Sequence, residues 1–216
     1  MWPFASMDGG DRPRIITPRV VMRPARLVDY REWAEVREAS REFLERWEPS
    51  WGNDPLSRGA YRRRVGHYRM IARRGMGLAF HVFVRDAGDG RSEGREALSL
   101  AGGLTLNNIR YGVVQSCNVG YWIGAHVARK GYMTEALAGA ADFVFDTLGL
   151  HRLEAACLPE NHRSIGLLEK LGFESEGYAR EYLLIDGRWT DHRLFGLIAT
   201  DWRRRRPLPP AVIDAG

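Results

Sequence analysis

The residues best suited to chemistry lie in a short glycine-centred turn. The segment Ala128–Leu137 contains Gly131 and follows the apolar run Val119–Ile123, so a strand, a loop and a helix are expected in that order. A loop in this position aims free backbone N–H groups at the start of the helix toward a phosphate or pyrophosphate. The expected binding residues are Arg129, Lys130, Gly131, Tyr132, Met133 and Thr134.

A second helix start follows at Asn161-His162-Arg163-Ser164, about one strand further along the chain. Asn161 is a good N-cap residue, and Ser164 stands in the first turn, where a hydroxyl can either support the cap or meet a ligand. Together, the two helix starts indicate a coenzyme A site and therefore acyl transfer, with Asn161 among the cofactor-binding residues.

Acyl transfer from a thioester requires few catalytic groups from a protein. The thioester is already activated, so the protein must hold an amine near its carbonyl and remove a proton. An N-terminal amine has a pKa of about 7.7–8.0 and a lysine about 10.4, so a single carboxylate base suffices for the former. Glu181 is a carboxylate in a run of Tyr and Leu, and by itself it indicates no more than an ordinary cross-strand ion partner. Backbone N–H groups near Trp122 and Ile123 could polarise the thioester oxygen.

Length and composition predict one domain. With 216 residues of which 44% are hydrophobic, the chain can bury a full core. Residues 1–13 are expected to be flexible, 14–202 to form the single domain, and 203–216 to be a basic, proline-rich tail that is loose after Arg206. The sequence shows neither a signal peptide nor a bilayer-spanning run, so a cytoplasmic location is expected.

The net charge and the two cysteines limit which classes of partner and ligand are expected. A formal charge of +5 favours an anionic partner, whether a phosphorylated cofactor, ribosomal RNA or an acidic protein surface. Cys117 and Cys157 lack metal-ligand spacing, so no metal is expected.

Periodicity and turn residues predict an α+β fold with a mixed sheet. A turn-rich loop over 86–96 and an Asp186-Gly187 hairpin turn separate some of the strands. Where one strand diverges from its neighbour, a slot would open between them. A ligand with an amide-rich arm can enter such a slot and form hydrogen bonds with the free strand edge. The expected strands are 15–23, 77–85, 97–106, 113–123, 151–158, 177–185 and 192–200, and the expected helices are 29–47 with a break near Ser40, 55–74, 134–148 and 161–171.

From Ile15 to Trp202 the chain resembles the GCN5-related N-acetyltransferase (GNAT) superfamily, and four segments resemble its RimJ/RimL branch. These segments are Phe43–Pro49, Val119–Ile123 with its turn, Leu150–Ala155, and the stretch from Asn161 onward. The superfamily turn usually begins with Gln or Arg and ends with Gly or Ala, whereas this chain has Ala128 and Met133 there. A larger residue such as Met133 could crowd the pyrophosphate, but Gly131 is present and Arg129 and Lys130 add positive charge, so a variant site that still binds coenzyme A is expected.

The resemblance implies a strongly bent, mostly antiparallel sheet of about seven strands flanked by helices. It also implies acetyl-CoA as cosubstrate and direct acetyl transfer to the N-terminal alanine of a small-subunit ribosomal protein, with the ribosome or a pre-ribosomal particle as a further partner. Glu181 would act as the base through a water molecule, and Ser164 would hydrogen-bond the departing thiolate. Trp47, Glu48 and Trp189 would line the peptide groove, with an acidic residue meeting the substrate amine.

Two alternatives remain open. The first keeps the cofactor but changes the acceptor to a small amine, an antibiotic or a lysine. The second is a ribosome-associated assembly factor or RNA-binding module with weak catalysis, in which Arg203–Arg206 hold phosphates. Neither membrane binding nor specific DNA binding is expected.

Overall fold

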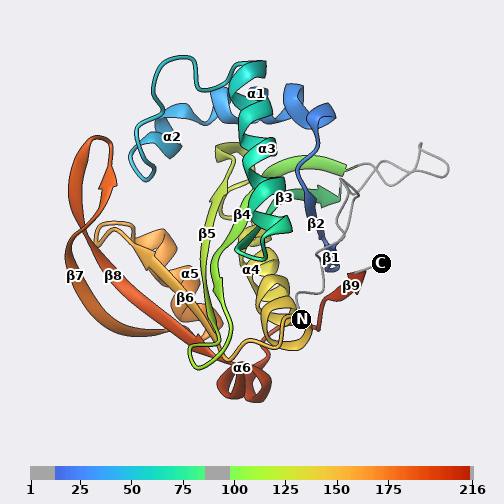
Figure 1. The fold of residues 1–216 in the computed structure, drawn as a ribbon, viewed down its shortest axis with the longest axis vertical. Helices are drawn as coiled ribbons and strands as arrows, with labels where there is room; N and C mark the ends of the chain where they lie inside the picture. The colour runs from blue at the N-terminus through green and yellow to red at the C-terminus, as the bar shows by residue number, and fades with distance from the viewer. Residues whose placement is uncertain (1–12, 86–97, 215–216) are drawn as a thin grey trace.

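The computed structural model describes residues 13–85 and 98–214. The predicted loop 86–96 and all but the last residue of the predicted flexible segment 1–13 lie outside these ranges. Within the described residues a single sheet runs through the molecule in the order β7-β8-β6-β5-β4-β3-β2-β1-β9 (Figure 1). All neighbouring strands are antiparallel except β5 and β6.

The sheet has nine strands in the described residues, where seven were expected. The single strand predicted over 15–23 is divided at Pro18 and Arg19, and a short strand near the C-terminus adds the ninth. Proline cannot donate to a strand ladder, which accounts for the division. The strands are β1 Arg14–Ile16, β2 Val20–Pro24, β3 Gly77–Arg85, β4 Leu98–Arg110, β5 Ser116–Ile123, β6 Arg152–Cys157, β7 Glu174–Ile185, β8 Arg188–Ile198 and β9 Val212–Asp214.

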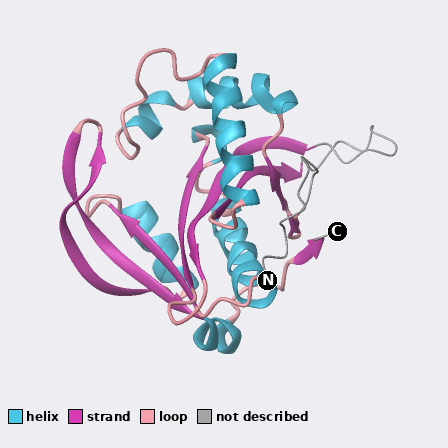
Figure 2. Cartoon of the chain, in the orientation of Figure 1, coloured by secondary structure: helices cyan, strands magenta, loops and turns pink. Residues whose placement is uncertain are grey.

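The predicted helices are present, including the break at Ser40 (Figure 2). None of the helices in the described ranges is both long and apolar enough to cross a bilayer. Figure 1 shows α1 and α2 at one end of the sheet and α6 at the other, while α3 runs from the first end along the middle strands. The helices are α1 Tyr30–Ala39, α2 Arg41–Glu45, α3 Arg58–Arg73, α4 Tyr132–Asp142, α5 His162–Leu171 and α6 Ala199–Arg205, with shorter turns η1 Leu27–Asp29, η2 Ala125–Val127 and η3 Phe143–Thr147.

Two apolar clusters hold the helices to the sheet. The larger one surrounds α4, whose Leu137 and Ala140 are fully buried together with Leu104 of β4. The smaller one packs Tyr61 and Val65 of α3 against α1 and the neighbouring strands. Because both clusters cover the middle of the sheet, the strands between them are fixed on two sides.

The sheet opens between β5 and β6, as expected for a slot. These parallel strands pair only from Ser116 with Arg152 to Asn118 with Glu154. Both strands continue beyond that point, and β6 stays paired with β8 as far as Cys157. The strands therefore diverge, and the far half of β5 has a free edge.

The C-terminal segment is ordered, which contradicts the loose end expected there. Trp202 of α6 is buried and donates its indole N–H to Asp142 at 2.8 Å. Arg203 pairs with Asp146 at 3.2 Å, and Arg206 pairs with both of these aspartates. The segment then ends in β9, which pairs with β1. These arginines neutralise carboxylates of the same chain, which argues against the tail as a phosphate-binding segment.

Candidate functional site

The glycine-centred turn has the backbone geometry of an anion site. Gly131 is the N-cap of the eleven-residue helix α4 and has φ of 82°, while Arg129 has φ of 65°. Within the described residues, no acceptor is found for the backbone N–H groups of Arg129, Lys130 and Gly131. Successive free amides at a helix N-terminus, with left-handed residues between them, form a cradle for phosphate.

A buried carboxylate holds this turn in place. Glu135, in the first turn of α4, accepts hydrogen bonds from the Thr17 hydroxyl at 2.7 Å, the Arg19 backbone N–H at 2.6 Å and the Arg19 Nε at 2.8 Å. Burial raises the pKa of Glu135, but these hydrogen bonds outweigh it and hold the pKa below its ordinary value. Arg19 also donates to the Lys130 carbonyl at 3.1 Å. These contacts of Glu135 with Thr17 and Arg19, called the Glu135 clamp below, join the turn to the β1–β2 connection.

The large side chain of Met133 packs into the core beside the turn. Its side chain is buried in the large apolar cluster, at 5% exposure. Met133 can therefore offer its backbone N–H to the anion site without filling it. The ring of Tyr132 instead lies under the Arg19 guanidinium, 5.0 Å from its centre.

The free edge of β5 offers backbone groups beside the turn. The amide of Gly124 donates to Ala101 of β4, and amides alternate in direction along an antiparallel strand. The N–H of Trp122 therefore also faces β4, whereas those of Tyr121 and Ile123 face the open side. Of the two amides predicted to polarise a carbonyl, only that of Ile123 is placed to do so.

Ser164 lies opposite this edge and contacts a tyrosine that sequence reasoning left out. Its hydroxyl is 2.7 Å from the Tyr121 hydroxyl, and its backbone N–H donates to the Asn161 side chain at 3.2 Å. Asn161 therefore caps α5. Burial raises the pKa of Tyr121, so this hydroxyl stays protonated at neutral pH. In the sequence, only the position of Tyr121 in the apolar run, two residues before Ile123, pointed to this tyrosine.

Glu181 occupies an irregular stretch of β7. The register with β8 shifts between Ala179 and Leu183, and Glu181 itself has φ of 45°. Asp191 of β8 holds this bulge, because it accepts the Glu181 backbone N–H at 2.8 Å and the Tyr178 hydroxyl at 2.7 Å. Within the described residues, the Glu181 carboxylate has no hydrogen-bond or ion-pair partner and is exposed. Bulges of this kind re-aim side chains near active sites.

Strand register connects Glu181 with Ser164. On β8, Asp191 is two residues from Arg193, which pairs with Cys157 at the end of β6. A hydrogen bond between Cys157 and Ser164 partly offsets the rise that burial causes in the Cys157 pKa. Along β8 the bulge therefore lies just past the end of β6, and the start of α5 contacts that end at Cys157.

Glu48 is not a free charge, which contradicts the role expected for it. Both of its carboxylate oxygens accept hydrogen bonds from Arg37, at 2.9 and 2.6 Å, and Trp51 donates to one of them at 2.9 Å. The Arg37 guanidinium also lies 4.2 Å from the centre of the Trp51 ring and 4.9 Å from that of Trp122. This cluster fixes the segment after α2 against the end of β5.

Trp47 and Trp189 lie on two segments that approach each other. Trp189 follows the β7–β8 turn and is 63% exposed, while Trp47 is half-buried after α2. A Cβ built on Gly187 in that turn would lie 3.9 Å from the Ser50 hydroxyl. The hairpin tip and the segment after α2 are therefore neighbours on the same side of the molecule.

Comparison with known proteins agrees with this geometry. Residues 19–174 match the model of the acetyltransferase (GNAT) domain family. The chain is 34% identical to the Escherichia coli (strain K12) [ribosomal protein uS5]-alanine N-acetyltransferase over 92% of this chain and 97% of that protein. It is 31% identical to the probable N-acetyltransferase YjcK of Bacillus subtilis (strain 168), over 84% of this chain and 95% of that one.

Among solved structures, Mycobacterium smegmatis RimJ in complex with CoA-disulfide superposes with a TM-score of 0.78. It is 31% identical and covers 88% of this chain and 90% of its own. The strand divergence, the glycine turn and the family match are thus consistent, and the chain belongs to the GNAT acetyltransferase family.

Proposed function

We propose that this protein transfers the acetyl group of acetyl-CoA to the N-terminal α-amine of a ribosomal protein that begins with alanine. The observation that carries the proposal is the bulge at Glu181, just past the end of β6, which presents an exposed carboxylate without a hydrogen-bond or ion-pair partner among the described residues. Relatives of similar length that resemble the chain throughout are named as enzymes of this activity.

The turn at Gly131 would hold the diphosphate of the cofactor. Its free amides and the N-terminus of α4 supply partial positive charge, and Arg129 and Lys130 add full charges. The free edge of β5 accepts an extended, amide-bearing arm as an added strand would be accepted. When bound, acetyl-CoA supplies the activated thioester. The N–H of Ile123 is directed to the same side and can stabilise negative charge on the acyl oxygen.

Glu181 would remove the proton from the acceptor amine. An N-terminal amine needs only a modest pKa shift to be uncharged at neutral pH, so one carboxylate suffices as its base. Direct contact or one bridging water would suffice for the transfer. The acceptor would lie between the hairpin, which exposes Tyr182 and Trp189, and the segment that carries Trp47.

Tyr121 and Ser164 would interact with the thioester sulfur of the cofactor. Their hydroxyls share a hydrogen bond of 2.7 Å, and the raised pKa of Tyr121 keeps a proton available there at neutral pH. Ser164 is in the first turn of α5, where the helix end also favours negative charge. This pair would therefore hydrogen-bond the sulfur as it gains charge.

The test is Glu181→Gln, assayed on a peptide that starts with alanine. General-base catalysis contributes typically 10²–10⁴-fold, so we expect kcat to fall by about that factor while the Kd for acetyl-CoA stays within about twofold. Glu174→Gln, an exposed glutamate on the same strand, should leave both unchanged. An unchanged kcat for Glu181→Gln would show that the base is assigned wrongly.

The acceptor is tested separately by intact-mass comparison of ribosomal proteins from cells with and without this chain. Loss of one acetyl group from a single alanine-starting protein of the small subunit is expected. Unchanged ribosomal proteins, together with acetylation of small amines by the purified enzyme, would favour the small-amine alternative.

A further inference from the structure

Helix α3 and its C-cap carry an unbalanced positive charge. Between Arg58 and Arg74 the sequence contains seven arginines and no aspartate or glutamate, and all seven side chains are exposed. The whole chain has a charge of +5, so subtracting these seven charges leaves −2. The basic character of the protein therefore comes from this one segment. The arginines are Arg58, Arg62, Arg63, Arg64, Arg69, Arg73 and Arg74.

The outward face of α3 presents these charges in rows. Its inner face is formed by Tyr61, Val65 and Ala72, which are buried. At 3.6 residues per turn, one row contains Arg58, Arg62, Arg69 and Arg73 along the flank of the inner face, and it extends over about 22 Å, since each residue rises about 1.5 Å. A second row contains Arg63 and Arg74.

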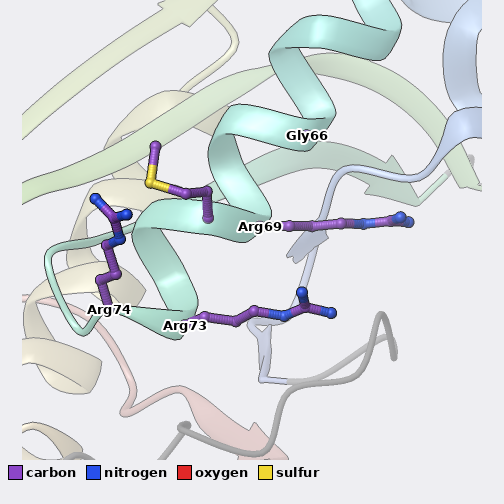
Figure 3. Close-up of a pocket in the computed structure, with 5 residues that line it drawn as sticks. Gly66, Arg69, Arg73 and Arg74 are labelled. Carbon is purple, nitrogen blue, oxygen red and sulfur yellow. The ribbon is translucent and has the colours of Figure 1, made fainter.

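A shallow hollow lies along this face. It has a volume of about 370 Å³ and is lined by Gly66, Arg69, Met70, Arg73 and Arg74. Figure 3 shows Arg69 and Arg73 extending side by side in the same direction, with Arg74 directed away from them. Gly66 has no side chain, so an elongated ligand can approach the helix backbone between the arginines.

These arginines differ from those elsewhere in the chain. Arg203, Arg204 and Arg206 pair with carboxylates of their own surroundings. In the part of the chain that the structure describes, Arg62, Arg63, Arg69 and Arg74 form no ion pair. Like charges at i and i+4, such as Arg58 with Arg62, destabilise a helix by about 0.2–0.5 kcal/mol per pair. A bound polyanion would remove this repulsion.

The chemistry of the face favours phosphate over a protein partner. Guanidinium groups match phosphate with two parallel hydrogen bonds, and arginine is the residue of choice for recognising nucleic-acid backbones. A protein interface would need apolar or aromatic anchors at its centre. On the described outer face of α3, Met70 is the one large apolar side chain, and it is only 37% exposed.

We propose that α3 and Arg74 form a docking surface for the phosphate backbone of folded RNA, read by charge and shape and not by base sequence. The choice of RNA over DNA rests on the proposed function, since a ribosomal acceptor is surrounded by RNA. The surface is separate from the acetyl-transfer site, because none of its arginines belongs to the loop at Gly131, to β5 or to the β7–β8 hairpin.

The test compares two triple variants that lose the same charge. Arg62→Gln/Arg69→Gln/Arg74→Gln alters the α3 surface, and Arg31→Gln/Arg188→Gln/Arg204→Gln alters exposed arginines elsewhere. Binding of a fluorescein-labelled RNA duplex of about 16 base pairs is followed by anisotropy across salt concentrations. Three lost phosphate contacts predict at least about tenfold weaker binding near 100 mM salt and a salt slope smaller by about two to three. The control should change affinity by less than about twofold.

Each other outcome overturns the proposal. Equal weakening in both triple variants would mean that net charge alone attracts RNA. Tighter binding of a labelled polyglutamate peptide than of the duplex, lost in the α3 variant, would assign the surface to an acidic protein. Equal binding of a DNA duplex would remove the RNA preference. Acetylation of a free alanine-starting peptide should be unchanged in the α3 variant, so failure of RNA binding is distinguishable from failure of the proposed function.

Discussion

On the cofactor side and on the acceptor side of the opening, a carboxylate holds a left-handed stretch of backbone by accepting hydrogen bonds. The two carboxylates differ in their burial and in how far along the chain their partners lie. On the cofactor side, Glu135 holds a turn that contains two left-handed residues, and on the acceptor side, Asp191 holds the left-handed Glu181. Both carboxylates have a lowered pKa because of the hydrogen bonds they accept. Glu135, however, is 7% exposed and bonds residues 116 and 118 positions away, whereas Asp191 is open to solvent and bonds residues 10 and 13 positions away.

The difference indicates how the site divides its tasks. The cofactor turn depends on the folded sheet, because the Glu135 clamp comes from the β1–β2 connection at the other end of the sequence. The acceptor bulge depends on one hairpin and its own side chains. Changes in that hairpin can therefore alter the acceptor while the cofactor turn and the fold stay intact.

The largest effect is expected from Glu135→Gln. The amide keeps the shape but directs an N–H₂ group at hydrogen-bond donors, so we expect a loss of about 2–3 kcal/mol in the free energy of unfolding and a higher KM for acetyl-CoA. Chemical denaturation and steady-state kinetics measure the two effects. Glu38→Gln, which removes an exposed partner of Arg41, should change neither.

The pH dependence of stability provides a second check on Glu135. Its pKa in the folded state lies below the ordinary glutamate value of 4.5, so the stabilisation that Glu135 provides is complete above that value and is lost as pH falls through the folded pKa. The wild type should lose more stability between neutral and acidic pH than Glu135→Gln does. Parallel curves for the two proteins would argue that the Glu135 clamp contributes nothing.

Asp191→Ala should produce the next effect, confined to the acceptor side. Without its acceptor, the Glu181 backbone can leave the left-handed conformation, and misplacement of a catalytic group by about 1 Å can cost about 10²-fold in kcat. The KM for acetyl-CoA and the thermal midpoint should stay near those of the wild type. Asp191→Asn retains an acceptor oxygen and should recover most of the activity. An equal loss in both variants would show that the charge of Asp191, and not its hydrogen bonds, is what matters.

The smallest effect is expected from Gly131→Ala, for which the chain offers a matched control. Gly131 and Gly112 have φ of 82° and 74°, so alanine costs each of them about 1 kcal/mol of stability. A Cβ at Gly131 would lie 3.3 Å from the Arg19 guanidinium, whereas nothing lies within 4 Å at Gly112. Only Gly131→Ala should raise the KM for acetyl-CoA, by about fivefold if close to 1 kcal/mol of binding is lost. A similar KM in both variants would place the cofactor elsewhere.

Local patterns in the sequence were sufficient for most of the fold. The Ser40 break, the helix after Gly131 and the Asp186-Gly187 turn each follow from a few adjacent residues, and the structure contains all three. Of the two additional strands, one arises where the predicted strand 15–23 divides at Pro18 and Arg19, and the other, β9, depends on non-local pairing. β9 has only three residues, and only its register with β1 makes it a strand.

The site was less accessible to sequence reasoning, because its supporting residues come from distant segments. Nothing near Glu135 in the chain indicates Thr17 or Arg19. Glu48 could not be recognised as neutralised until Arg37, eleven residues earlier, was found against both of its oxygens. Residue types in the sequence identified the side chains that could react. Tertiary contacts, which the sequence does not show, decide whether such a side chain is free or already paired.

The pairing of β9 with β1 closes one edge of the sheet. Residues 212–214 lie along the outer edge of β1, so the backbone groups of that edge are paired within the same chain and are not open to a second copy. Deleting the residues after Arg206 should expose this edge and favour edge-to-edge self-association.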